Sequence, residues 1–280
     1  MTWRLRIKHR TGFRYENDVV ASYNEARMTP VTNVFQTALE ARVEVRPVTA
    51  TARYWDYWGT QVYAFDVHVP HTELQVVATS VVETLETPPP HEGAPWEALA
   101  DEGIRDKYVE WLAPTTRTTL DDELSQIANG FAKAQAPGET AMQICEFVHS
   151  QVEYVPGATE VHASVADVWH ERKGVCQDIA HVAVSLLRGC GIPARYVSGY
   201  LHPVPDAVVG EPTAGESHAW VEWWDGGWTS YDPTNDIPVG ERHVLVGRGR
   251  DYGDVPPLKG LYSGAGSSTL GVTVEVTRLA

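Results

Sequence analysis

The sequence predicts an α+β fold in two parts, a β-rich region over residues 1–90 and a region of helices packed on an antiparallel sheet over residues 91–280. Through about residue 86, apolar and polar residues alternate with the two-residue period of half-buried strands. Beyond three consecutive prolines, the apolar spacing lengthens to that of amphipathic helices. Short alternating runs then follow the last helix, and this order of segments is typical of an α+β chain.

The β-rich region combines this alternation with many β-branched and aromatic residues. It is clearest over residues 42–46, 61–69 and 76–85. Gly59 stands where a hairpin would turn between two strands. Residues 88–90 are all proline, which can neither extend a ladder nor begin a regular helix here. We therefore place the boundary between the two regions at residue 90.

Four segments beyond the boundary have apolar residues at helical spacing. They cover residues 120–131, 137–148, 164–170 and 176–188. The last segment is apolar over most of its circumference, which indicates a buried helix. Three strands are expected after it, over residues 194–201, 218–224 and 228–232, with the last two joined by a turn at residues 225–227.

The charge balance limits the partners of this chain. Its 280 residues include 22 Lys and Arg against 37 Asp and Glu, a formal net charge of −15. This acidic balance argues against binding to nucleic acid or to anionic lipid. The sequence has neither the apolar run of a signal peptide nor a stretch of about 18 apolar residues to span a membrane. Three cysteines fit a reducing compartment, and we expect a cytoplasmic protein.

Cys176 is the strongest candidate nucleophile. Gly174 permits a sharp turn just before it, so its thiol falls in the first turn of the buried helix. There the helix dipole and the unpaired N–H groups favour thiolate over thiol and can stabilise an oxyanion. Cys145 and Cys190 lack this setting, and we expect both in the core. Taken alone, Cys176 is equally compatible with a buried structural thiol.

His218 and Asp232 are the candidate base and orienting carboxylate. His218 stands at the head of an expected strand and Asp232 at the end of the next. Antiparallel pairing about the turn at 225–227 would bring position 218 opposite about 232–234, so the carboxylate can reach the imidazole and fix its tautomer. Without that pairing, His218 would be a structural histidine and Asp232 a turn residue before proline.

Three further residues near this set have other expected roles. Asp178 faces away from the thiol on its helix, so we expect it to support the first turn or to pair with a basic group such as Arg195. His181 and Cys190 lack metal-ligand spacing, and no metal site is expected. Tyr154, upstream of the nucleophile, is a candidate for the second oxyanion donor.

Four separated segments resemble the transglutaminase-like superfamily, which shares the papain-type arrangement of Cys, His and Asp. They cover residues 174–178, 188–200, 217–220 and 231–235. The preceding strands resemble the β-rich N-terminal region of bacterial members, and residues 242–257 resemble their C-terminal signature. The resemblance implies a papain-like core in which Cys176 is the nucleophile, His218 the general base and then acid, and Asp232 the orienting carboxylate.

A thiolate beside an imidazole attacks an acyl carbon and forms a thioester, which water or an amine then resolves. For bacterial members, the resemblance implies that water usually resolves the thioester. We therefore expect a cysteine-dependent amide hydrolase or peptidase acting on a peptide or other amide substrate. Two alternatives stay open: transglutaminase-type acyl transfer from glutamine to an amine, and a non-catalytic peptide-binding module of the same fold. No acidic loop has calcium-binding spacing, and we expect no cofactor.

Overall fold

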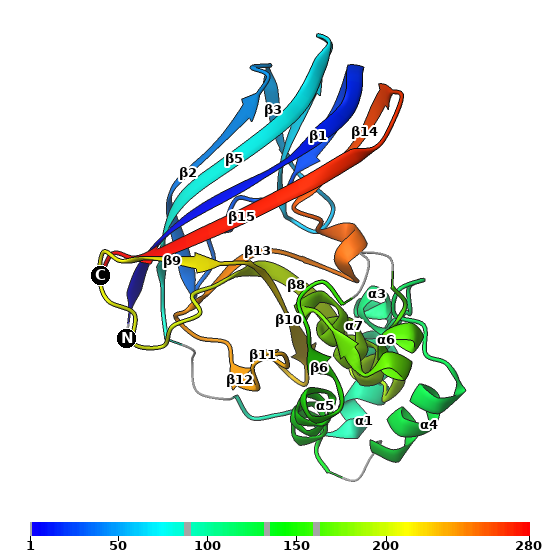
Figure 1. The fold of residues 1–280 in the computed structure, drawn as a ribbon. Helices are drawn as coiled ribbons and strands as arrows, with labels where there is room; N and C mark the ends of the chain where they lie inside the picture. Colours follow the sequence, from blue (N-terminus) through cyan, green and yellow to red (C-terminus); the bar gives the residue numbers. More distant parts are fainter. Residues whose placement is uncertain (1, 87–90, 132–134, 159–162) are drawn as a thin grey trace.

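A computed structural model describes residues 2–86, 91–131, 135–158 and 163–280. It contains two antiparallel sheets, a short two-stranded parallel ladder and a group of helices (Figure 1). Most strands of the larger sheet come first along the chain, and the helices and the smaller sheet follow, as the α+β class predicts. This class is therefore confirmed. The proline run at residues 88–90 lies outside the described residues.

The larger sheet has eight strands and is built around a first strand of 24 residues. Its members are β1 (Trp3–Ala26), β2 (Gln36–Arg46), β3 (Thr51–Trp55), β4 (Gln61–Val67), β5 (His71–Thr84), β9 (Pro212–Gly215), β14 (Leu258–Gly264) and β15 (Ser268–Arg278). The main path is β2-β5-β1-β15-β9, with β14 and β4 also paired to β1, and β3 to β4. The hairpin predicted at Gly59 is confirmed, since β3 and β4 pair antiparallel on either side of it.

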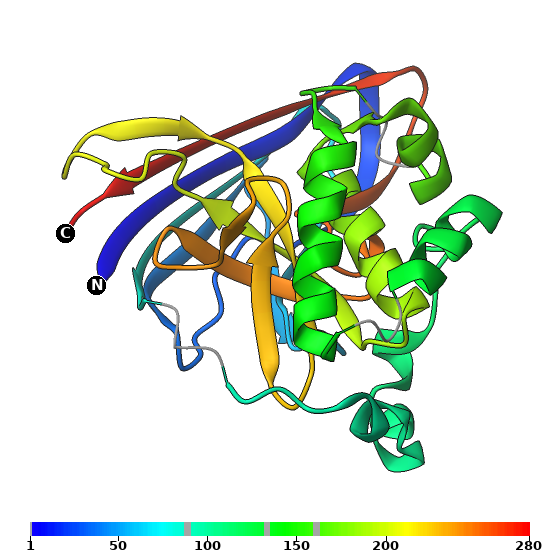
Figure 2. The same cartoon turned by 90° about the horizontal axis from the view of Figure 1, so that it is seen from below.

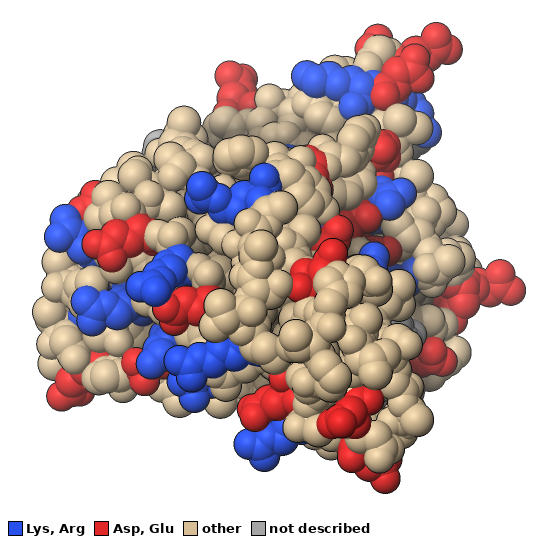
Figure 3. Space-filling view, turned by 90° about the horizontal axis from the view of Figure 1, so that it is seen from above, with Lys and Arg blue, Asp and Glu red and all other residues tan. Residues whose placement is uncertain are grey.

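Alternation along β1 gives the larger sheet two different faces. Leu5, Ile7 and His9 are buried, whereas the basic residues between them are exposed, because successive side chains of a strand point to opposite faces. Figure 3 shows Lys and Arg side chains interspersed with Asp and Glu over one face of the molecule. The buried face of β1 packs on a core that also holds Tyr200 and Val244 of the second sheet.

The helices gather on one side of the molecule, below the long strands of the larger sheet in Figure 1 and on the right in Figure 2. They are α1 (Trp96–Ala100), α2 (Glu102–Lys107), α3 (Val109–Leu112), α4 (Asp122–Phe131), α5 (Pro137–Gln151), α6 (Val165–Glu171) and α7 (Cys176–Gly189). The four predicted helices correspond to α4 to α7. The last of them is buried from Asp178 to Arg188 and contacts α4, α5 and α6, as its apolar circumference predicts. In the part of the chain that the structure describes, none of the helices has the length and apolar character to cross a membrane.

The second sheet carries the three predicted strands at its centre. In order it consists of β12 (Ile237–Pro238), β11 (Trp228–Asp232), β10 (Ser217–Trp224), β8 (Ala194–Leu201) and β13 (His243–Gly249). Trp224 pairs with Trp228 and Val221 with Tyr231, so the predicted hairpin and its register are correct. The short parallel ladder joins β6 (Glu153–Tyr154) to β7 (Lys173–Gly174) beside the start of α7.

The end of the chain returns to the larger sheet. β15 pairs with β1 along eleven residues, from Leu5 opposite Arg278 to Tyr15 opposite Ser268, and β9 pairs with the other edge of β15. Val276 of β15 is buried in the same apolar cluster as Leu5. The boundary at residue 90 stays a prediction, and strands from both sides of it complete the larger sheet. This return places β15 near the candidate nucleophile.

Candidate active site

Cys176 is the first residue of α7, where the sequence predicts it. The turn that leads into the helix needs a glycine, because a Cβ at Gly174 would lie 2.8 Å from Cβ of Asp178 and 3.3 Å from a methyl group of Val168. The Asp178 carboxylate accepts a hydrogen bond of 2.9 Å from the backbone N–H of Val175. This bond supports the first turn of α7 and holds the thiol at the positive end of the helix dipole.

Arg195, the example given for a basic partner of Asp178, has a different partner. Arg195 binds Glu222 instead, with Nε 2.5 Å from a carboxylate oxygen, and Arg248 contacts the same buried carboxylate at 2.7 Å. Burial by itself raises the pKa of Glu222, but the two guanidinium groups outweigh it and hold the pKa at about 2. The sequence could not indicate this pairing, because Arg195 faces Glu222 only through the register of β8 with β10.

The three cysteines lie in different surroundings. Cys176 is partly exposed, and its thiol lies 3.9 Å from the carbonyl oxygen of Ser217. Cys145 is fully buried, and burial raises the pKa of its thiol far above the ordinary range. Burial also raises the pKa of Cys190, to about 11. Of the three thiols, the one at the start of α7 therefore has the setting of a reactive group.

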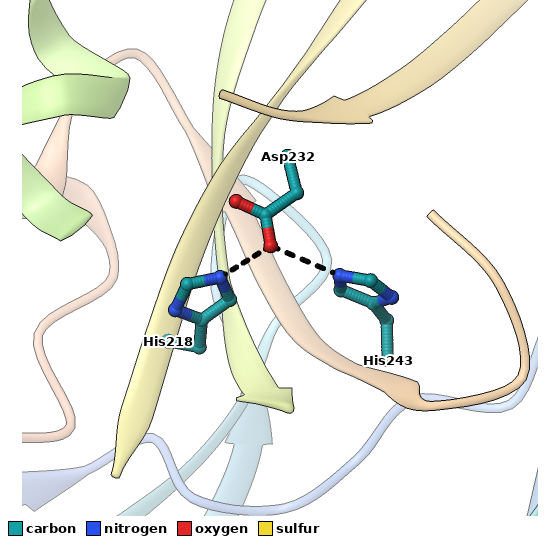
Figure 4. Close-up of side chains that lie close together, drawn as sticks. All are labelled: His218, Asp232 and His243. Carbon is teal, nitrogen blue, oxygen red and sulfur yellow. Dashed lines mark hydrogen bonds and ion pairs between the residues drawn. The ribbon is translucent and has the colours of Figure 1, made fainter. Parts of the chain in front are cut away.

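His218 lies between Cys176 and Asp232. Its Nε2 is 2.7 Å from Oδ2 of Asp232, and its ring lies close enough to the Cys176 side chain to interact with it. Figure 4 shows the second ring nitrogen of His218 on the side away from Asp232. Burial alone lowers the pKa of His218, but the hydrogen bonds and negative charges of its two partners raise it to about 10. The imidazolium form is therefore favoured at neutral pH.

Asp232 is fully buried at the end of β11, and every oxygen of its carboxylate accepts hydrogen bonds. Oδ1 accepts from the backbone N–H groups of Thr234 and Asn235 at 3.0 and 3.2 Å. Oδ2 accepts from the Asn235 amide at 2.8 Å as well as from His218. Burial favours the neutral acid, but hydrogen bonds and charge from His218 and His243 outweigh it, and the pKa of Asp232 lies well below its ordinary value.

A second histidine binds the same carboxylate. His243, at the start of β13, has its Nε2 3.2 Å from Oδ2 of Asp232 (Figure 4). Its Nδ1 accepts a hydrogen bond from the backbone N–H of Gly240 at 3.2 Å, so the proton of the neutral ring sits on Nε2 and is donated to the carboxylate. Burial is the largest effect on this ring and lowers the pKa of His243, which is therefore neutral at neutral pH.

The cluster of His218, Asp232 and His243 also has the composition of a metal site, with its three ligand atoms within 4.8 Å of one another. A metal ion would bind His243 through Nε2 and require the proton on Nδ1. That proton would then face the N–H of Gly240, which already donates to Nδ1. The surrounding hydrogen bonds thus favour protons over a metal ion in this cluster.

A cavity of about 550 Å³ opens beside Cys176 and His218. Tyr154 lines it, but its hydroxyl donates a hydrogen bond of 2.8 Å to Glu216. Burial and this carboxylate raise the pKa of Tyr154, which stays a neutral phenol. Its role as an oxyanion donor stays a prediction.

Two family models match separate parts of this chain. A family model described as the transglutaminase-like superfamily matches residues 125–233, and one described as the bacterial transglutaminase-like N-terminal region matches residues 5–83. An uncharacterized protein of Mycobacterium leprae is 48% identical over 278 residues, covering 99% of this chain and 100% of that protein. The chain belongs to the transglutaminase-like superfamily.

Two other proteins are similar to this transglutaminase-like chain. A protein-glutamine gamma-glutamyltransferase of Pseudomonas aeruginosa is 33% identical over 155 residues, which is 50% of this chain and 22% of that protein. The crystal structure of a candidate cysteine protease from Cytophaga hutchinsonii superposes with a TM-score of 0.80 at 23% identity, covering 100% of this chain and 92% of that one. The second likeness shows that the fold is shared.

The structure of this superfamily member brings together the three predicted residues Cys176, His218 and Asp232, and their catalytic roles stay predictions. The sequence reasoning missed Asn235 and His243. Asn235 follows Asp232 by three residues in the segment 231–235, so its position was visible without its role. His243 reaches Asp232 only because β13 pairs with β8 on the far side of β10, which no local pattern indicates.

Proposed function

We propose that this transglutaminase-like protein is a cysteine-dependent hydrolase of amide bonds, acting on peptides or related amides. The observation that supports this most is the 2.7 Å hydrogen bond from His218 to the buried Asp232, with Cys176 beside the same imidazole in one cavity. A thiol, an imidazole and a buried carboxylate in this order form the nucleophile, base and orienting group of acyl-transfer enzymes. The position of the thiol at the start of a buried helix adds to this.

The proposed reaction has two halves. The sulfur of Cys176 attacks the amide carbon, and His218 gives its proton to the departing amine, which leaves a thioester on the enzyme. Water then attacks the thioester carbon while His218 takes a proton from it. The carboxylic acid is released, and the thiolate and imidazolium are restored. Asp232 keeps the His218 ring oriented and stabilises its charged form throughout.

Alkylation and hydrolysis test this proposal together. We expect iodoacetamide to modify Cys176 at least about tenfold faster than Cys145 or Cys190 at pH 7, because a thiolate is the reacting species. Mass spectrometry of tryptic peptides identifies the adduct. Cleavage of a peptide library should be lost in Cys176→Ala and kept in Cys190→Ala, the matched control. Equal, slow labelling of all three thiols would instead favour the non-catalytic peptide-binding module.

Acyl transfer to an amine is the second candidate function. The similarity of half of this chain to the Pseudomonas aeruginosa protein-glutamine gamma-glutamyltransferase favours it. The thioester step is the same, and only the acceptor differs. Glutamine-containing peptides supplied with a labelled primary amine distinguish the two functions. Incorporation of the amine without release of free acid would make hydrolysis the wrong choice.

We further propose that the protein works in the cytoplasm without a nucleic-acid or membrane partner. The net charge of −15 supports the absence of such partners, because it opposes attraction to anionic polymers and lipids. Three free cysteines support a reducing compartment. Fractionation of cells that express the natural chain tests the location. Recovery outside the cytoplasm would overturn it.

A further inference from the structure

The cavity beside Cys176 lies between the two sheets. One wall comes from the start of α7 and from β10, and contains Cys176 and His218. The opposite wall comes from the larger sheet, through β1 and β15. Residues at both ends of the sequence thus line the space that a substrate of Cys176 would enter. Its volume of about 550 Å³ lies within the range of clefts that bind small molecules, so it has room for a substrate side chain.

The wall from β15 is apolar. Leu270, Val272 and Val274 occupy every second position of this strand and therefore share the face that looks into the cavity. Val274 is buried, whereas Leu270 and Val272 are 56% and 48% exposed. We call these three side chains the β15 shelf. Two large apolar side chains left open in a cavity indicate that an apolar group can cover them.

A buried polar atom lies next to the β15 shelf. His9 of β1 stands opposite Val274 in the sheet, is 1% exposed and lines the same cavity. Its Nδ1 is 3.0 Å from the hydroxyl of Tyr200, while its Nε2 has no hydrogen-bond partner among the residues that the structure describes. Burial lowers the pKa of His9 to about 4, so the ring is neutral. The wall of the cavity beside the β15 shelf therefore carries no charge at this position.

The charges around the cavity argue against a charged occupant of the β15 shelf. The neutral His9 ring offers no counter-charge to an acidic side chain. Glu216, which lines the cavity and accepts the Tyr154 hydroxyl, would repel one. A basic side chain could reach Glu216 but would lose its hydration against Leu270 and Val272.

We propose that the β15 shelf binds a large apolar side chain of the peptide substrate, next to the amide bond that Cys176 attacks. This inference rests on the proposed function for the choice of ligand. It gives the larger sheet a role in selecting the substrate, because Leu270 and Val272 belong to β15 of that sheet.

Peptide binding to the Cys176→Ala protein tests the shelf without any chemistry. Blocked fluorescent peptides that differ at one position, with Leu, Phe, Gly, Asp or Lys, are titrated and followed by anisotropy. We expect Leu and Phe peptides to bind at least about tenfold more tightly than Asp and Lys peptides. Burial of a Leu or Phe side chain alone is expected to lower the dissociation constant by more than this factor. Val272→Asp and Leu270→Asp should remove the preference.

Leu261→Asp is the matched control, since Leu261 is 78% exposed on β14 and does not line the cavity. It should keep the preference. Equal binding of all five peptides, or equal effects of Leu261→Asp and Val272→Asp, would overturn the proposal. Iodoacetamide labelling of Cys176 in the wild-type protein reports on the proposed function separately, so failure of one can be told from failure of the other.

Discussion

Two histidines donate to a single oxygen of Asp232 from opposite sides, His218 at 2.7 Å and His243 at 3.2 Å. They differ in charge, because the pKa of His218 is raised to about 10 while that of His243 is lowered. His218 also contacts Cys176, whereas the other nitrogen of His243 is held by Gly240. We infer that His243 is a positioning residue, which fixes the carboxylate that in turn orients His218.

Replacing His243 tests this role. His243→Phe removes the donor to Asp232, so the carboxylate is free to rotate, and we expect peptide hydrolysis to fall about 10- to 100-fold with little change in KM. The basic limb of the pH profile should move to lower pH, because a loosened carboxylate stabilises the His218 imidazolium less. His243→Gln keeps an N–H donor, so it should restore part of the hydrolysis rate and move the basic limb of the pH profile part of the way back. An unchanged pH profile in His243→Phe would contradict the role.

The pair formed by His218 and Asp232 should make the stability of the protein depend on pH. The raised pKa of His218 contributes stability that is complete below its ordinary value of about 6.5 and is lost as the pH rises toward 10. The lowered pKa of Asp232 contributes stability above its ordinary value of about 3.9, which is lost in acid. Asp232→Asn should therefore reduce the free energy of unfolding most between about pH 4 and 6.5, by about 3 to 5 kcal/mol.

Urea denaturation of wild type and Asp232→Asn at pH 5, 7 and 9 measures this difference. It should shrink as the pH rises. A difference that stays constant across the series would mean that His218 is not charged in the folded protein.

Among the elements, β8 determines how closely the second sheet packs behind the site. Its Gly199 lies opposite His218 of β10. A Cβ at this position would collide with the carbonyl oxygen of Val244 and lie 2.5 Å from the Trp220 ring. Trp220 in turn packs edge-on against His243, with ring centroids 5.3 Å apart. The glycine thus allows an indole to lie against the histidine pair.

Gly199→Ala is expected to destabilise the protein by about 1 to 3 kcal/mol or more, because neither the backbone of β13 nor the buried Trp220 can move away easily. Gly130→Ala is the matched control. Gly130 lies in α4 with nothing within 4 Å of the added Cβ, so this change should stabilise the helix by about 0.5 to 1 kcal/mol. Thermal unfolding compares both variants with wild type. If Gly199→Ala melted at the same temperature as wild type, the second sheet would have to accommodate the added methyl group without cost.

On the scale of the whole molecule, β15 ties the end of the chain to its beginning and the larger sheet to the second one. Val276 lies in the apolar cluster that joins Leu5 of β1 with Val244 of β13. The Gln36 side chain adds a polar link, since it donates to the carbonyl of Leu245 and accepts from its N–H, both at 2.8 Å. The two sheets should therefore unfold together.

Val276→Ala tests this coupling. The loss of a buried valine side chain should lower the free energy of unfolding by about 2 kcal/mol, whereas Val272→Ala, on the half-exposed β15 shelf, should cost less than about 0.5 kcal/mol. Two signals should follow the unfolding of Val276→Ala: the helical circular dichroism and the labelling of Cys145, which is buried in the helical core. Both should change in one transition, at a lower temperature than in wild type. Two separate transitions would show that the parts are independent.

Two features of the site, the buried helix α7 and the hairpin after it, can be predicted from the spacing of residues in the sequence alone. Residues 176–188 are apolar around the circumference of a helix, which predicts the buried α7 with Cys176 at its start. The two glycines after Asp225 set the hairpin register that brings Asp232 to His218. These contacts lie within one helix or one hairpin, so the periodicity of the side chains is enough to predict them.

Contacts between segments that are distant in sequence became visible in the tertiary structure and could not be predicted from local patterns. His243 joins Asp232, and Arg195 joins Glu222, through the pairing order of the second sheet. The β15 shelf comes to face Cys176 because the chain end returns to β1. Alternation tells which residues of a strand share a face, but it does not tell which strand becomes the neighbour, because that depends on apolar surface buried by the whole chain at once.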